Sequence, residues 1–161
     1  MRSHAYKWRG FTLMEMLVVL AILGILAAAA HPMLALSKRR QQEVELRTAL
    51  RTLRTAIDAY KQLSTDGHVV LNVGDSGYPE NLTVLVDGVV DARDPTLRKK
   101  IYLVRRLPRD PFADPSIPAD QTWGLRSYDS PPDAPAPGKD VFDVHSLSDG
   151  VGLDGIPYGD W

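Results

Sequence analysis

The fold of this chain is decided by residues 9–30, which read RGFTLMEMLVVLAILGILAAAA. Every residue from Met16 to Ala30 is apolar or glycine, and Glu15 is the only charged residue between Phe11 and Pro32. An α-helix rises ~1.5 Å per residue, so about 20 such residues span the ~30 Å hydrocarbon core of a bilayer. The stretch therefore predicts a membrane-spanning helix, which we place over residues 11–36.

Glu15 does not prevent insertion of this helix. About a dozen large apolar side chains each favour insertion by ~0.3–0.6 kcal/mol, whereas one acid costs at most ~3 kcal/mol. An acidic residue that is kept inside such a segment is treated as functional by default. The sequence therefore singles out Glu15 as a candidate functional residue.

The motif Gly10-Phe11-Thr12-Leu13-Met14-Glu15 resembles the prepilin processing site of type IV pilins and type II secretion pseudopilins. In that family, a prepilin peptidase cuts after the glycine and methylates the new N-terminus. The resemblance implies removal of the short basic leader, residues 1–10, by cleavage between Gly10 and Phe11. It also implies N-methylation of Phe11 and an assembly role for Glu15.

The assembly role of Glu15 has a physical basis. Cleavage would leave a cationic α-amine on Phe11 at the head of an apolar helix, and methylation keeps that charge. In a fibre of staggered helices, the amine of one subunit can meet Glu15 of a neighbour. An isolated carboxylate is very costly at low dielectric, whereas a paired one is tolerated. We therefore expect the pair to set the register between subunits.

A conventional secretory signal is the main alternative for this region. Residues 27–30 are alanines and could imitate the small-residue cleavage site that follows the apolar part of such a signal. The apolar run would then be discarded, and a soluble domain, binding protein or enzyme would be secreted. The Gly10–Phe11 site favours retention of the run.

The helical pattern continues beyond the apolar run. Pro32 is expected to kink the helix because proline removes one backbone hydrogen bond. Residues 37–64 are amphipathic and continue the same helix to about Leu63, with Asp66-Gly67 as the stop signal. One apolar stripe recurs at three- and four-residue steps and predicts a buried face: Leu46, Leu50, Leu53, Ile57 and Tyr60.

Residues 65–161 hold most of the glycine and proline and predict a small domain of short elements. Residues 69–71 could form a short strand, and 81–86 a short helix or turn. Residues 122–128 and 141–145 predict an antiparallel hairpin, joined by a long proline-rich loop at 131–138. Its apolar face is expected to cover the helical stripe, which gives an α+β fold: one long helix packed on a small antiparallel sheet with a loop-rich C-terminal region.

The later part of the chain narrows the resemblance. Residues 76–79, 106–112, 140–143 and 148–161 are similar to the major pseudopilin of type II secretion. Type IV pilins usually close their C-terminal region with a disulfide, and this sequence has no cysteine. The resemblance implies a structural subunit of a periplasmic pseudopilus that helps drive protein export across the outer membrane. A type IV pilus subunit, which forms a surface filament, is the alternative.

The same resemblance implies a location and partners. The chain would be a single-pass protein of the bacterial inner membrane, with its C-terminal domain in the periplasm. Its partners would be further copies of itself, membrane lipid, the prepilin peptidase, the inner-membrane platform and minor pseudopilins. The formal net charge of −1 gives no basic footprint for nucleic acid.

The C-terminal tail carries a possible metal site. Major pseudopilins bind calcium in a loop here, and the resemblance carries that role to Asp149 and then to Asp154. Calcium takes 6–8 oxygen ligands, but this tail has Ile156-Pro157-Tyr158 where the family usually has further acids. The alternative is that these are solvated turn aspartates.

We expect no enzyme in this chain. Asp143, His145 and Ser146 lie too close together on one predicted strand to converge as a catalytic triad, and no nucleophile elbow is present. The four histidines show no zinc-binding spacing.

Overall fold

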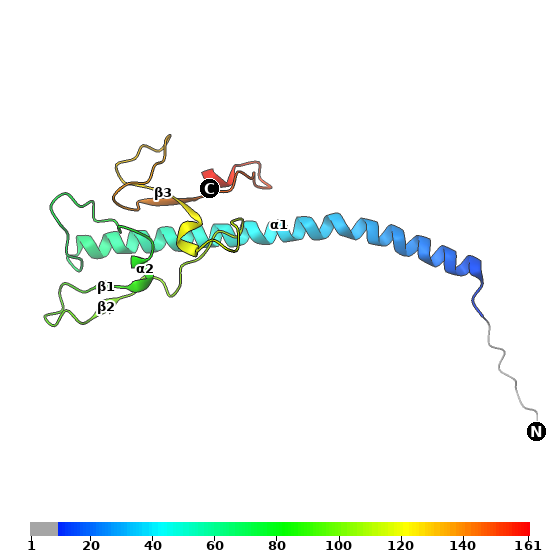
Figure 1. Ribbon diagram of the computed structural model, residues 1–161, viewed down its shortest axis with the longest axis horizontal. Helices are drawn as coiled ribbons and strands as arrows, with labels where there is room; N and C mark the ends of the chain where they lie inside the picture. Colours follow the sequence, from blue (N-terminus) through cyan, green and yellow to red (C-terminus); the bar gives the residue numbers. More distant parts are fainter. Residues whose placement is uncertain (1–9) are drawn as a thin grey trace, which may run out of the picture. The chain divides into compact units, whose positions relative to one another are not determined.

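The computed structural model describes residues 10–161, with only the backbone described at residues 28–32. The leader, apart from Gly10, lies outside the described residues. The chain divides into two compact units, Met1–Arg39 and Arg40–Trp161. Figure 1 shows one long helix, with all the short elements following it along the chain.

Helix α1 covers Leu13–Thr65. The residue before the helix is Thr12, whose hydroxyl oxygen accepts a hydrogen bond from the backbone N–H of Glu15 at 3.2 Å, as an N-cap side chain does. The helix ends before Gly67, which has a φ of +76° that glycine adopts without strain. The single helix and its glycine stop are as the sequence predicts. The backbone stays helical through residue 32, and the kink at Pro32 stays a prediction.

Across the described residues, we find no helix with an apolar stretch that is long enough to cross a membrane. The membrane-spanning segment over residues 11–36 stays a prediction from the sequence.

The core of the second unit is built on the apolar stripe of α1. Leu46, Leu53 and Ile57 are fully buried, and the other two stripe residues are nearly so. Burying one such side chain contributes about 1.5–3 kcal/mol. The stripe shares one cluster with Leu85 and Val144, which come from later elements. The predicted buried face is therefore confirmed.

The remaining elements are short. Helix α2 covers Val84–Asp87, and two 3₁₀ turns, η1 and η2, cover Ala119–Gln121 and Tyr158–Asp160. Strands β1 (Val89–Val90) and β2 (Lys100–Ile101) form one antiparallel pair. Strands β3 (Trp123–Arg126) and β4 (Asp143–Ser146) form another, with Leu125 opposite Val144. The predicted α+β class and hairpin are confirmed, although the strands form two separate sheets.

The predicted strand at residues 69–71 is wrong. These residues form a loop, and Val70 is 78 % exposed. The run lies between the turn at Gly67 and a second turn in which the N–H of Asp75 bonds the carbonyl of Asn72 at 3.1 Å. No other described segment pairs with it, so its two valines, although β-branched, do not form a strand.

Buried carboxylates connect the loops of the second unit. Asp140 accepts hydrogen bonds from the Ser127 hydroxyl at 2.7 Å, from the Tyr128 backbone N–H at 2.8 Å, and from the Ser76 hydroxyl. Burial alone would raise the pKa of Asp140, but these hydrogen bonds outweigh burial and lower the pKa below its usual value. Asp140 thus joins the loop after α1 to the end of β3.

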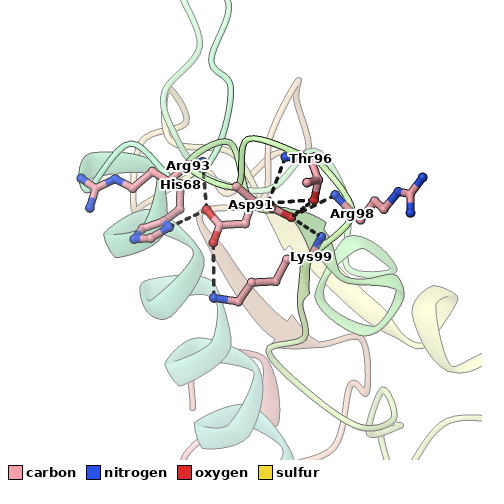
Figure 2. Close-up of polar contacts among 7 residues, drawn as sticks. His68, Asp91, Arg93, Thr96, Arg98 and Lys99 are labelled. Carbon is pink, nitrogen blue, oxygen red and sulfur yellow. Dashed lines mark hydrogen bonds and ion pairs between the residues drawn. The ribbon is translucent and has the colours of Figure 1, made fainter.

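A second polar cluster shapes the loop between β1 and β2. The Asp91 carboxylate contacts the His68 ring at 2.8 Å, the Arg93 backbone N–H at 3.0 Å and the Lys99 ammonium at 3.6 Å (Figure 2). Hydrogen bonds from His68 and Arg93 lower the pKa of Asp91. Asp94 accepts backbone bonds from Thr96 and Lys99, which lower its pKa to about 2.

The lowered pKa values of Asp91, Asp94 and Asp140 lead us to expect a loss of stability in acid. Their pKa values are lower in the folded chain than in the unfolded one, so they stabilise the fold above pH ~4 and lose that effect as the pH falls through the folded values. We expect the free energy of unfolding to fall from pH ~4 toward pH ~2. Urea unfolding across this range measures it. Asp94→Asn should have a weaker pH dependence below pH ~4 than the parent, and an equally steep profile would contradict the assignment.

Candidate functional site

The predicted processing bond, between Gly10 and Phe11, precedes the first turn of α1. Gly10 is exposed and non-helical, and a Cβ built on it would meet no other atom within 4 Å. Phe11 is 72 % exposed. The bond is therefore exposed and lies outside the helix, as access by a peptidase requires.

Glu15 lies in the first turn of α1, on the same turn as Thr12. Its carboxylate is exposed and has no hydrogen bond or ion pair with any residue that the structure describes. An acid in the first turn gains ~0.3–1 kcal/mol from the helix dipole. This gain is small and occupies neither carboxylate oxygen, so Glu15 can still pair with a cation of a second molecule.

The helix after Glu15 exposes a continuous apolar surface. Large apolar side chains cover it all round, and each is at least two-fifths exposed: Met16, Leu17, Val18, Val19, Leu20, Ile22, Leu23, Ile25 and Leu26. Soluble monomers rarely expose apolar patches larger than a few hundred Å². This surface is therefore suited to lipid or to the same helix in other copies.

The C-terminal tail does not present its two aspartates as a calcium site. Asp149 is exposed, whereas Asp154 accepts a hydrogen bond from Arg47 at 2.7 Å and another from the Ile156 backbone N–H at 3.1 Å. Within residues 10–161, no group of three or more histidine or acidic side chains is placed to hold a metal. The described side chains do not form the set of oxygen ligands that calcium needs. Calcium binding therefore stays a prediction that rests on the resemblance alone.

The tail is instead bound by three side chains of α1 that the sequence analysis missed: Glu43, Arg47 and Arg54. Glu43 is buried, and its carboxylate accepts hydrogen bonds from the Leu153 backbone N–H at 2.8 Å and from the Tyr158 hydroxyl at 3.0 Å. The signal was available, because Glu43 precedes Leu46 by three residues and so lies on the buried stripe.

The residues considered for a hydrolase are engaged elsewhere. Asp143 forms an ion pair with Arg54 at 2.7 Å, and the Ser146 hydroxyl donates to the buried Asp110 at 2.5 Å. The structure therefore does not bring Asp143 and Ser146 together as a catalytic pair.

Comparisons with known proteins agree with the motif and extend beyond it. A family profile described as the prokaryotic N-terminal methylation motif matches residues 9–30. The chain is 31 % identical to the type II secretion system core protein G of Aeromonas hydrophila over 109 residues, which cover 66 % of this chain and 68 % of the relative. It is 32 % identical to the protein of the same name from Vibrio cholerae over 111 residues, covering 67 % and 68 %.

A pilin relative matches only a shorter part of the chain. The type IV major pilin protein PilA of Myxococcus xanthus is 48 % identical over 48 residues, which cover 30 % of this chain and 22 % of the relative. No solved structure matches. The likeness to core protein G includes two thirds of both chains, so this chain belongs to the type IV pilin and pseudopilin superfamily, in the type II secretion system core protein G family.

Proposed function

We propose that this chain, once cut between Gly10 and Phe11, polymerises through the first half of α1 into a periplasmic pseudopilus that helps to drive protein export across the outer membrane. One observation carries the proposal: an exposed apolar helix begins with a carboxylate, Glu15, for which the described residues supply no partner. Burying both the surface and the charge requires other copies of the helix, whose Phe11 amines supply the missing cation.

Before assembly, the same apolar surface would hold the chain in the inner membrane. The N-terminal motif of the family implies an N-terminus anchored at a membrane. We propose a single pass over residues 11–36, with the second unit in the periplasm. The prepilin peptidase, the inner-membrane platform and minor pseudopilins are the partners that such a path requires, and membrane lipid surrounds the helix until it joins the fibre.

A type IV pilus subunit is the second candidate, and the extent of the matches weighs against it. The Myxococcus xanthus pilin matches over only 48 residues, whereas the core protein G matches run over about 110. Deleting the gene separates the two functions. Loss of secreted enzymes with surface filaments retained supports the pseudopilus, and the reverse result supports the pilus.

Mass spectrometry of the membrane-extracted chain tests processing directly. We expect a mature chain that begins with N-methylated Phe11 in cells with the prepilin peptidase and keeps residues 1–10 in cells without it. The expectation follows from the accessible Gly10–Phe11 bond. A soluble product that begins after residue 30, with or without the peptidase, would instead establish conventional secretion.

A further inference from the structure

The C-terminal tail folds into a tight loop within the second unit. Val151 and Pro157 form an isolated antiparallel bridge, and the Gly152 N–H bonds the Ile156 carbonyl at 2.8 Å. Gly155 turns the chain at a φ of +84°. Asp154 lies at this turn, where its carboxylate bonds the Ile156 backbone and faces α1.

Arg47 connects this loop to α1 in two ways. Its guanidinium forms the ion pair with Asp154 at 2.7 Å and also lies over the Trp161 ring, 4.0 Å from the ring centroid. A planar guanidinium can bond a carboxylate at its edge while its face stacks on an aromatic ring. One cationic side chain thus holds both the turn and the last residue of the tail.

Two neighbouring side chains of α1, Glu43 and Arg54, also bind the tail. Glu43, one turn before Arg47, accepts the Leu153 and Tyr158 hydrogen bonds. Arg54, two turns after it, donates to the backbone oxygen of Trp161 at 2.7 Å and to that of Val144 at 3.0 Å. The tail is therefore tied to α1 at several points, by charges that belong to the helix itself.

We propose that Arg47 serves as the cation of this loop, so that the tail of this chain closes without a divalent metal ion. Calcium would need six to eight oxygens, and the Asp154 carboxylate is already bonded on both of its oxygens. A metal at Asp154 would also have to sit beside the Arg47 charge or displace it. This tail has fewer acidic residues than the family usually has. The Arg47 guanidinium supplies the positive charge that Asp154 binds.

Thermal unfolding of the full-length chain in detergent, with excess EDTA or with calcium chloride, tests the metal side of the proposal. We expect the two midpoints to agree within ~1 °C, because a ligand that does not bind the folded state cannot stabilise it. A midpoint that rises by several degrees in calcium chloride, relative to a magnesium chloride control, would overturn the proposal.

Arg47→Met tests the arginine side. Methionine keeps much of the apolar length but removes the charge and the plane, so we expect the midpoint to fall by ~3–6 °C. Arg51→Met is the matched control, because Arg51 lies one turn later, is exposed, and makes no hydrogen bond or ion pair within the described chain. Equal falls of the unfolding midpoint in the two variants would contradict the role of Arg47. Arg47→Lys, which keeps only the charge, should lie between Arg47→Met and the parent.

One consequence rests on the proposed function: fibres of this chain should form and persist in EDTA. If no fibre forms under any condition, the pseudopilus proposal is at fault. The unfolding experiment needs no fibre and still decides the role of Arg47.

Discussion

Glu15→Ala is expected to be cut and methylated normally but to assemble few or no fibres. The substitution leaves the Gly10–Phe11 bond exposed and the hydroxyl cap of Thr12 in place. It removes the only carboxylate of the apolar segment, so each Phe11 amine would enter the fibre without a counter-charge. An uncompensated charge at low dielectric costs several kcal/mol, which is enough to reduce assembly by more than about a hundredfold.

Two further variants separate pairing from a local effect on the helix. Glu15→Gln keeps the size of the side chain and should fail like alanine, because only the charge is lost. Thr12→Val removes the cap of the same turn, at a cost of ~0.5–2 kcal/mol, and should still assemble. Electron microscopy of sheared fibres measures all three variants against the parent. Fibres of normal yield from Glu15→Ala would refute the register role, and failure of Thr12→Val alone would indicate that the first turn matters instead.

Glu43→Ala is expected to destabilise the second unit by about 2–4 kcal/mol. Glu43 is 4 % exposed, and the substitution removes the carboxylate that accepts hydrogen bonds from the Leu153 N–H and the Tyr158 hydroxyl. Losing the acceptor of a buried hydrogen bond, as at the Tyr158 hydroxyl, costs ~1–3 kcal/mol, and loss of the part-buried Leu153 bond adds to it. Urea unfolding followed by tryptophan fluorescence measures the change, because Trp161 packs edge to face on Tyr158 with ring centroids 5.0 Å apart.

The matched control is Glu45→Ala, two residues along the same helix. Glu45 is exposed, and its carboxylate accepts a hydrogen bond from Gln41 at 3.1 Å. Surface substitutions of this kind change stability by about 0.5 kcal/mol or less. If both variants unfold at the same urea concentration, Glu43 does not hold the tail in the way that its geometry indicates.

Local patterns predicted much of this fold. The continuous helix, its stop before Gly67 and the buried stripe from Leu46 to Tyr60 follow from the periodicity of apolar residues and from glycine, both of which act within a few residues. The β3–β4 hairpin follows from two alternating segments on either side of a proline-rich loop. The predicted processing motif needs no tertiary structure to be recognised, because its residues are consecutive in the sequence.

Patterns failed at segments of only two or three residues. Residues 69–71 have strand-forming side chains but no strand to pair with, whereas Val89–Val90 was not predicted and finds one in Lys100–Ile101. Two-residue strands carry too little periodicity to be recognised. Their pairing depends on which backbone groups the rest of the domain brings together.

The sequence by itself determined the helix with its single carboxylate and the family to which the chain belongs, and it predicts the processing site. Only the tertiary structure decided how the tail is held, because Glu43, Arg47 and Arg54 are about a hundred residues from the groups that they bind. A charged side chain on a helix can be solvated, bind a metal or bind a distant loop. Which of these interactions it makes depends on the groups that folding places within about 3 Å of it.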